Sequence, residues 1–259
     1  MHSAIRSVSL LALTATGAHA QVSFSDNFDN GPSPQWMNQR GNWAAVNGRY
    51  DALAPSNSPP TLTTLPYVLG DFELALDVHG AVDGGVWLHT DGSGDNGVLL
   101  VIGGFSHTGN GFYFHRITNG SYGGPEGLSG PQFAPGSDIH VRVTAVGATY
   151  SVYLNGNTTP ATTLTLPQPR TGLVGLYDYA TPGHSYDNVV LTDTMCDSID
   201  FNGDGLFPDN QDIEDFFSVF GGGPCSTGAC GDIDFNNDGL FPDNLDLELF
   251  LSVFGGGGC

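Results

Sequence analysis

The sequence contains no lysine, and its formal net charge is −21 because six arginines face 27 acidic residues. A surface of this charge repels the phosphates of nucleic acids and the anionic headgroups of membranes, whereas it attracts divalent cations. Long hydrophobic runs are also missing, since the apolar stretch near the start is too short to span a bilayer. We therefore expect no nucleic-acid binding and no membrane insertion, and we expect metal cations to bind.

The first twenty residues have the pattern of an export signal. Arg6 precedes a largely apolar run from Val8 to Leu13, and Ala18-His19-Ala20 offers the small residues of a cleavage site. An uncleaved tail explains this pattern less well. We predict a signal peptide over residues 1–20, cleaved near Ala20, and a protein that is secreted, held at the cell surface or periplasmic.

Cysteine is scarce and confined to the end of the chain. The segment that begins at the first cysteine holds 13 acidic residues and no basic one, and its four cysteines are Cys196, Cys225, Cys230 and Cys259. An exported chain with regularly spaced cysteines and no C-x-x-C motif is expected to form structural disulfides. The change in composition at about Met195 predicts two domains, residues 21–194 and residues 195–259.

The acidic segment is a tandem repeat. Residues 196–225 and 230–259 align with an offset of 34, and 22 of the 30 positions are identical. Four cysteines allow three pairings. Closure of each repeat on itself favours disulfides Cys196–Cys225 and Cys230–Cys259.

Each repeat carries a D-x-N-x-D-G loop followed by two further aspartates. Alternate oxygen side chains on a tightly curved loop can converge on one hard cation, which favours calcium over zinc or copper. A single such motif is often only an acidic turn, but two copies in register make that alternative weak. The expected ligands, with carbonyl oxygens from the leucines, are Asp200, Asn202, Asp204, Leu206, Asp209 and Asp212, then Asp234, Asn236, Asp238, Leu240, Asp243 and Asp246.

A helical pattern follows each loop. Apolar residues recur at i, i+3, i+4 and i+7, which predicts two amphipathic helices whose stripes pack together. Asp212 and Asp246 are expected to cap them. The stripes are Ile213, Phe216, Phe217 and Phe220 in the first repeat, and Leu247, Phe250, Leu251 and Phe254 in the second.

On these loops and helices the segment 196–259 resembles type I dockerin modules. The resemblance implies calcium binding and attachment to a partner protein. The chain departs from the family in a loop one residue longer, through Phe207-Pro208, and in the bracketing cysteines. Gln211 and Asp215 of the first repeat are replaced by Leu245 and Leu249 in the second. This leucine pair is expected either to dock on a partner or the larger domain, or to pack between the repeats.

Residues 21–194 alternate with period two. Phe72, Leu74, Leu76 and Val78 are separated by mainly polar residues, and the same alternation recurs around residues 139–143 and 150–154. About a dozen such segments, separated by Gly, Pro, Asn and Asp, predict a mainly β protein. Its expected fold is an antiparallel jelly-roll sandwich with a small C-terminal α module of calcium loops and helices.

The order of motifs in this domain resembles the laminin-G-like, concanavalin-type jelly rolls of secreted bacterial proteins. These include the 3-keto-disaccharide hydrolase domains and related sugar-binding modules, so the resemblance implies this fold and a saccharide ligand. The motifs are FSDNFDNG, GNWAAVNGRYDA, GGVWLHTDGSGDNGVLLVIGG, GFYFHRI, HVRVTAVGATYSVYLNG, TGLVGLYDY and HSYDNVVL.

Two strands offer candidate sugar-binding residues. Trp87 and His89 are expected on one strand face, and Tyr113 and His115 on one face of another, where aromatic rings could stack on sugars. A solvated sheet face or a core in another register explains them equally. The paired carboxylates of E-x-D-x-x-E are absent. We therefore expect an extracellular glycan ligand rather than hydrolysis. A 3-keto-disaccharide type hydrolase or lyase and a structural surface protein without a ligand remain the alternatives.

Overall fold

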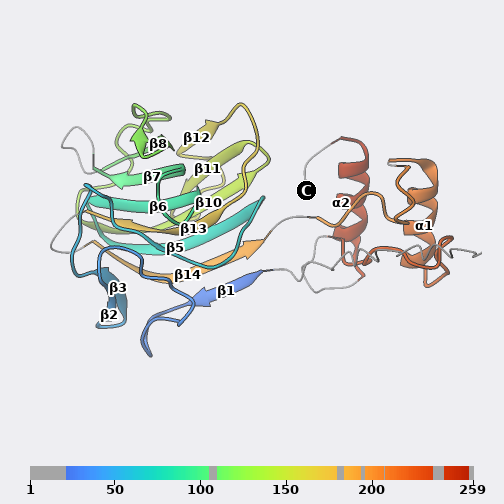
Figure 1. Ribbon diagram of the computed structural model, residues 1–259, viewed down its shortest axis with the longest axis horizontal. Coiled ribbons are helices and arrows are strands. Elements are labelled where there is room, and N and C mark those ends of the chain that lie inside the picture. The colour runs from blue at the N-terminus through green and yellow to red at the C-terminus, as the bar shows by residue number, and fades with distance from the viewer. Residues whose placement is uncertain are drawn as a thin grey trace, which may run out of the picture.

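A computed structural model describes residues 22–104, 110–179, 184–193, 196–206, 208–235 and 242–256. Two layers of strands form a sandwich, and two helices lie beside it (Figure 1). The last strand ends at Asp193 and the first helix begins at Asn210. None of the helices in these residues is long and apolar enough to cross a membrane.

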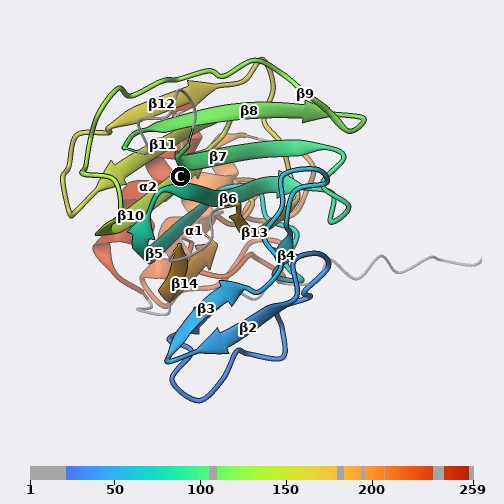
Figure 2. The same ribbon diagram turned by 90° about the vertical axis from the view of Figure 1, so that its left-hand side faces the viewer.

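One layer is an eight-stranded antiparallel sheet with the order β12-β11-β10-β5-β14-β3-β2, and β1 also pairs with β14. The hairpin of β2 and β3 projects at the edge of the molecule (Figure 2). The strands are β1 (Ser23–Asp26), β2 (Trp43–Val46), β3 (Arg49–Ala52), β5 (Phe72–Ala81), β10 (Ser137–Val146), β11 (Thr149–Leu154), β12 (Thr162–Thr165) and β14 (Ser185–Asp193).

The second layer is a six-stranded antiparallel sheet with the order β4-β13-β6-β7-β8-β9. Strands β6, β7 and β8 form its centre, where each pairs with its sequence neighbour in regular register. Its strands are β4 (Thr63–Thr64), β6 (Asp83–Thr90), β7 (Gly97–Gly103), β8 (Phe112–Thr118), β9 (Ser121–Tyr122) and β13 (Leu173–Asp178).

The main core lies between the two sheets, as the alternation of the sequence requires. Phe72, Leu74, Leu76 and Val78 of β5 are all buried there. They face apolar side chains of the six-stranded sheet, including Val86, Leu88, Phe112 and Phe114. The expected fold class, a mainly β sandwich of two antiparallel sheets followed by two helices, is confirmed.

Tight turns follow from Asn-Gly pairs. Asn47 and Gly48 both have positive φ, 54° and 74°, and they join β2 to β3 directly. Two consecutive residues with positive φ form the turn whose twist matches that of the flanking strands, and Asn and Gly tolerate this backbone best. Asn155 and Gly156, after β11, repeat the pattern with φ of 51° and 76°.

The tail contains α1 (Asn210–Phe220) and α2 (Asn244–Phe254). The expectation that Asp212 and Asp246 are the caps is corrected by three residues, because the N-caps are Asp209 and Asp243. Asp212 and Asp246 instead return a carboxylate to the backbone N–H of the cap, which completes a capping box in each helix. Both aspartates are fully buried.

The two repeats share one core. The N–H of Asp197 donates to the carbonyl of Phe235 at 2.9 Å, and the N–H of Gly231 donates to the carbonyl of Phe201 at 2.7 Å. Asp197 is equivalent to Gly231, and Phe201 to Phe235, at the repeat offset of 34. Each bond is therefore the counterpart of the other, and the repeats are related by a pseudo-twofold axis. The buried residues are the equivalent pairs Ile199 and Ile233, Phe201 and Phe235, and Phe216 and Phe250.

Two sequence predictions about the tail require correction. Phe217 and Leu251 do not join the buried stripe, because they are 45% and 43% exposed at equivalent positions of the two helices. The disulfide pairing favoured above is wrong, because Cys225 bonds to Cys230 with a Cα–Cα distance of 5.7 Å. Since the repeats pack on each other rather than closing separately, the end of the first lies beside the start of the second. Cys196 is also disulfide-bonded, and Cys259 lies outside the described residues.

Candidate functional site

The outer face of the six-stranded sheet carries a second, smaller cluster of buried side chains. Its members are Leu62, Trp87, Leu99, Val101, Tyr113, Ile117 and Tyr177. A hollow of about 260 Å³ lies against it, lined by Asn57, Pro60, Asp83, Leu99, Val101, Tyr113, His115, Tyr122 and Tyr177. Three tyrosines, one histidine and one carboxylate therefore meet in one concavity, which we call the tyrosine hollow.

Two of the four sequence-predicted ligand residues line the tyrosine hollow. Tyr113 and His115 both lie on β8 and face outward, as their alternation with the buried Phe112 and Phe114 predicts. The His115 ring packs edge-on against Tyr113 and Tyr122, with centroid distances of 5.2 and 5.7 Å. Its Nδ1 lies 2.7 Å from the carbonyl oxygen of Gly123, so Nδ1 carries the proton that this bond requires.

The other two predicted residues do not line the hollow. Trp87 has the expected outward direction, but it is 0% exposed because the segment before β4 covers it, and its Nε1 donates to the carbonyl of Thr61 at 3.0 Å. His89 is turned the opposite way by a positive φ of 48° beside a β-bulge. Its Nδ1 lies 2.6 Å from the hydroxyl of Tyr150, a residue of the core between the sheets.

Asp83, Tyr122 and Tyr177 were missed by the sequence analysis. Asp83 belongs to the same strand face as Trp87, two alternations earlier on β6, so the period-two pattern could have found it. Burial raises the pKa of Asp83 to about 6. Desolvation also raises the pKa of Tyr122 to about 12 and raises that of Tyr177, so both hydroxyls keep their protons at neutral pH.

The shifted pKa of Asp83 predicts a pH-dependent stability. The folded protein holds this proton up to about pH 6, whereas the unfolded chain loses it near the ordinary value of 3.8. The folded state thus binds more protons in this window, and its stability falls as the pH rises through it. Asp83→Asn removes this loss. The difference in free energy of unfolding between Asp83→Asn and wild type is expected to increase in favour of the variant by about 2–3 kcal/mol from pH 4 to pH 7.

Chemical denaturation at several pH values, with calcium present, measures this difference. Asp29→Asn is the matched control, since Asp29 is an exposed aspartate of the same domain. A difference between Asp83→Asn and wild type that stays constant across the pH range contradicts the assignment.

One further hollow adjoins the tyrosine hollow, and a third adjoins that one. Tyr122 also lines a hollow of about 460 Å³ beside β8 and β9, and Arg170 lines both this one and a hollow of about 340 Å³ at the end of β6. Arg116 lies in the middle hollow in a two-point ion pair with Glu126, at 2.5 and 2.8 Å. Shared lining residues connect the three hollows in series.

The first predicted calcium loop is tightly curved. The N–H of Gly205, whose φ is 79°, donates to Oδ2 of Asp200 at 3.1 Å. The N–H of Asp204 donates to the amide oxygen of Asn202 at 3.0 Å, and the N–H of Leu206 donates to Asp204 at 2.8 Å. These bonds bring the D-x-N-x-D-G side chains around the inside of one turn, as the spacing predicts.

The donor set of this loop fits a hard cation. Oδ1 of Asp200 is buried and accepts no hydrogen bond within the described part of the chain, and a desolvated carboxylate oxygen needs a partner. Asp212 is fully buried, and it accepts the N–H of Asp209 at 3.0 Å. No three of the loop carboxylates place one oxygen each within 4.8 Å of the others among the described residues.

The second loop is only partly covered, because Asn236, Asp238 and Leu240 lie outside the described residues. Its helical end repeats the first loop: the N–H of Asp243 donates to Asp246 at 2.9 Å, and the N–H of Leu245 donates to Asp243 at 2.7 Å. Asp234 lies at the start of this loop and is partly buried, as is the equivalent Asp200.

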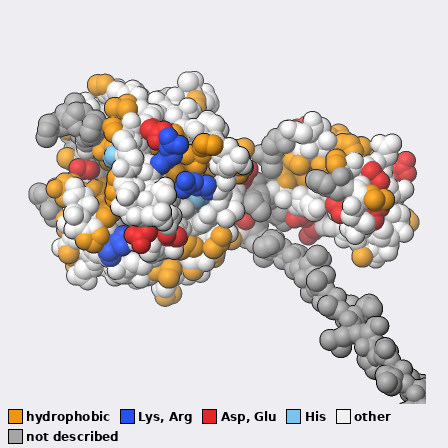
Figure 3. Space-filling model, turned by 45° about the horizontal axis from the view of Figure 1, so that its top comes forward, with side chains coloured by type: hydrophobic (Ala, Val, Ile, Leu, Met, Phe, Trp, Pro, Cys, Tyr) orange, Lys and Arg blue, Asp and Glu red, His pale blue; other side chains and the backbone are white. Residues whose placement is uncertain are grey.

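The substituted pair Leu245 and Leu249 does not form one exposed stripe. Leu249 is partly buried against the shared core of the repeats, whereas Leu245 is 44% exposed. Packing between the repeats therefore accounts for Leu249. Leu245 is exposed to solvent on the tail. The surface of the tail visible in Figure 3 carries acidic but no basic side chains.

No protein-family model matches this sequence, and no curated protein matches it either. Among solved structures, the β-glucanase of Bacillus licheniformis is 16% identical with a TM-score of 0.47, over 69% of this chain and 99% of its own. Carbohydrate binding module CBM66 from Bacillus subtilis is 15% identical with a TM-score of 0.45, over 61% and 92%. The exoplasmic/lumenal domain of VIP36, in a form bound to Ca²⁺ and Man3GlcNAc, is 12% identical with a TM-score of 0.47, over 67% and 90%.

Proposed function

We propose that this protein binds an extracellular carbohydrate in the tyrosine hollow, and that calcium folds its C-terminal repeats into an attachment module. The observation that carries the first half is the meeting of Tyr113, Tyr122, Tyr177, His115 and Asp83 in one concavity. Aromatic faces with a few polar groups between them suit sugar rings, which have apolar faces and a rim of hydroxyls.

Each group has a distinct part in this proposal. Tyr122 is 41% exposed, so its ring is available for stacking on a sugar. The protonated hydroxyl of Tyr177 can donate to ring or hydroxyl oxygens. The carboxyl group of Asp83 accepts from sugar hydroxyls when ionised and can donate when protonated, so binding near pH 6 is expected to depend on pH.

The positions of the glutamates favour carbohydrate binding over a hydrolysis that a pair of glutamates would catalyse. Only two glutamates precede the tail, Glu73 and Glu126. Glu73 bonds to Arg142 at 2.9 Å on the eight-stranded sheet, and Glu126 is bound at both oxygens by Arg116. Glu73 lies on β5 of the eight-stranded sheet, whereas Glu126 pairs with Phe114 at the edge of the other sheet. Each is engaged by its own arginine, so the two do not form the pair of carboxylates that acts on one glycosidic bond.

Calcium is the proposed ligand of both acidic loops. It supplies a divalent charge that the carboxylates need in order to lie close together. Asp200, Asn202, Asp204, the carbonyl of Leu206, Asp209 and Asp212 would hold it in the first repeat, with the equivalent residues in the second. Attachment of the tail to a partner protein follows from the dockerin resemblance. The exposed large apolar side chains available for it among the described tail residues are Leu206, Phe217, Leu245 and Leu251.

A glycan array tests the carbohydrate half of the proposal. The full-length protein with calcium is expected to bind oligosaccharides, because three hollows follow one another through shared lining residues. Tyr122→Ala is expected to weaken binding about tenfold, since it removes the exposed stacking face. Calorimetry with the best oligosaccharide on the array measures this loss.

Tyr153→Ala is the control, because Tyr153 lies on the eight-stranded sheet beneath Arg142 and lines none of the three hollows. Equal losses in both variants, or an array without any binding, contradict carbohydrate recognition at this face. Turnover of oxidised disaccharides, which the 3-keto-disaccharide hydrolase resemblance allows, would show that the function is catalysis and not carbohydrate recognition.

A further inference from the structure

Asp215 is a buried carboxylate of α1 with four hydrogen-bond donors. It accepts the N–H of Ser226 at 2.8 Å, the hydroxyl of Ser226 at 2.5 Å, the amide of Asn202 at 3.1 Å and the amide of Gln211 at 3.3 Å. Only 3% of its surface is exposed. A buried charge with several donors fixes the geometry of every group that donates to it.

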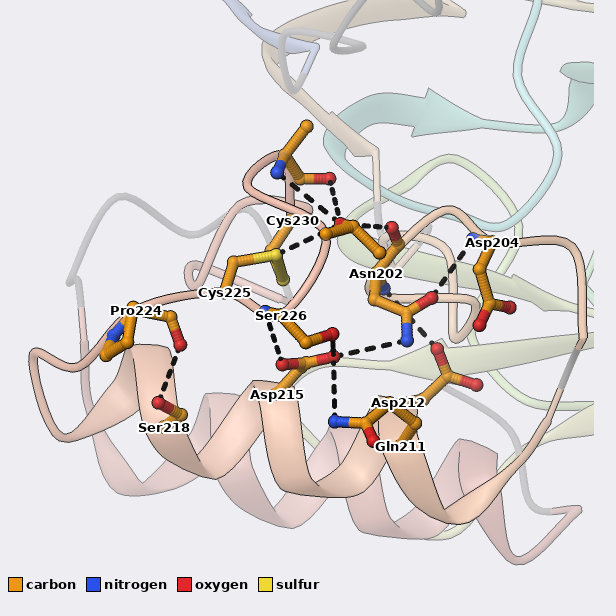
Figure 4. Close-up of a disulfide and its surroundings, with 12 residues drawn as sticks. Asn202, Asp204, Gln211, Asp212, Asp215, Ser218, Pro224, Cys225, Ser226 and Cys230 are labelled. Carbon is orange, nitrogen blue, oxygen red and sulfur yellow. Dashed lines mark hydrogen bonds between the residues drawn. A yellow bond between two sulfur atoms is a disulfide. The ribbon is translucent and has the colours of Figure 1, made fainter.

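One of these donors belongs to the proposed calcium loop. Because the carboxylate of Asp215 takes the Nδ2 of Asn202, the amide oxygen of Asn202 must point the other way, into the loop, where it accepts the N–H of Asp204 (Figure 4). An asparagine amide can be turned over at little cost unless a neighbour distinguishes its two ends. Asp215 supplies that distinction and presents oxygen, the calcium ligand, to the loop.

Two of the other donors belong to the linker between the repeats, and both come from Ser226. Cys225 and Cys230 close a short ring through their disulfide, and Ser226 and Thr227 lie inside this ring. Ser226 binds Asp215 twice, while the hydroxyl of Thr227 donates to the backbone carbonyl of Asn202 at 2.8 Å. The disulfide-closed linker thus holds both the carboxylate and the loop residue that the carboxylate orients.

The second repeat lacks this arrangement. Leu249 occupies the position equivalent to Asp215, and Leu245 the position equivalent to Gln211. A leucine accepts no hydrogen bond, so it cannot orient the amide of a neighbouring asparagine.

We infer that Asp215 is a positioning residue for the first calcium loop, and that the Cys225–Cys230 linker braces it. The two proposed calcium sites are therefore unequal, and only the first depends on Asp215, on Ser226 and on the disulfide. This inference rests on the proposed calcium binding of the loops. It assigns a purpose to the cysteines of the linker, which the dockerin resemblance leaves unexplained.

Calcium titration of single-site proteins tests the brace. Asp234→Asn with Asp238→Asn disables the second loop of the full chain, so calorimetry reports the first site alone. Adding Gln211→Leu and Asp215→Leu, which copies the second repeat, is expected to weaken that site about tenfold, the effect of losing hydrogen bonds to a buried charge. Cys225→Ser with Cys230→Ser is also expected to lower the calcium affinity of the first site. Glu214→Gln, an equal loss of charge at the exposed neighbouring position, is expected to leave the affinity unchanged.

The reverse background completes the design. With Asp200→Asn and Asp204→Asn disabling the first loop, the leucine pair is expected to leave the second site unchanged. Circular dichroism at saturating calcium checks that the helices persist; if the leucine variant loses them, Ser226→Ala replaces it, with a smaller loss expected. Equal affinity in braced and unbraced proteins, or equal losses at both sites, overturns the brace alone. A wild-type protein that binds no calcium overturns the calcium half of the proposed function and the brace with it.

Discussion

Phe250→Ala is expected to unfold the C-terminal module while the sandwich stays folded. Phe250 is fully buried and stacks on Phe216, with ring centroids 4.0 Å apart and planes 10° apart. It also meets Phe235 edge-on at 5.2 Å. Truncation of a buried phenylalanine costs about 3–5 kcal/mol. A core this small provides little stability beyond that, so the loss is expected to unfold the module.

Far-UV circular dichroism and limited proteolysis measure the effect at saturating calcium. Leu251→Ala is the matched control, because Leu251 is the next residue on the same helix and is largely exposed; its change is expected to stay within about 0.5 kcal/mol. Phe216→Ala is expected to match Phe250→Ala, since the pseudo-twofold axis makes the two positions equivalent. Retained helical signal and protease resistance in Phe250→Ala would contradict a shared core.

Removing calcium is expected to melt the same module and spare the sandwich. The loop carboxylates of each repeat repel one another without a cation between them, and Asp212 and Asp246 are fully buried. Extracellular sites of this kind bind calcium with Kd of about 10⁻⁴ to 10⁻³ M. If Kd is about 10⁻⁴ M, calcium at about a hundred times that concentration stabilises the module by about 2.7 kcal/mol per site.

Two thermal transitions are expected in scanning calorimetry, and only the tail transition should fall when a chelator replaces calcium. Magnesium at the same concentration serves as the control, because it demands a strict octahedral geometry and usually keeps several waters rather than a full set of protein ligands. A tail transition at the same temperature with calcium, magnesium and chelator would contradict the assignment.

Periodicity predicts the sandwich well because each strand has one face in the core. The alternation around Phe72 places four side chains between the sheets, and the offset of 34 places equivalent phenylalanines in one core. Both patterns are fixed spacings that can be read from the residue types, and burial enforces both. The positions of Tyr113 and His115 follow from the same alternation on β8.

What the sequence does not predict depends on backbone exceptions and on distant segments. His89 leaves the outer face because of one left-handed residue at a bulge, which period-two counting does not include. Trp87 is covered by a segment more than twenty residues away in sequence, and nothing in the sequence of β6 indicates that this segment lies there. The disulfide depends on how two repeats pack, whereas the pairing favoured from sequence treats each repeat alone.

Calorimetric titration of calcium into chelator-stripped protein tests whether the acidic repeats bind calcium, on which both the module's fold and its brace depend. Wild-type protein is expected to bind two calcium ions, Asp200→Asn with Asp204→Asn one, and a chain that ends at Asp193 none. Absence of heat in the wild type, or a stoichiometry that neither change alters, would show that the acidic repeats are solvated turns.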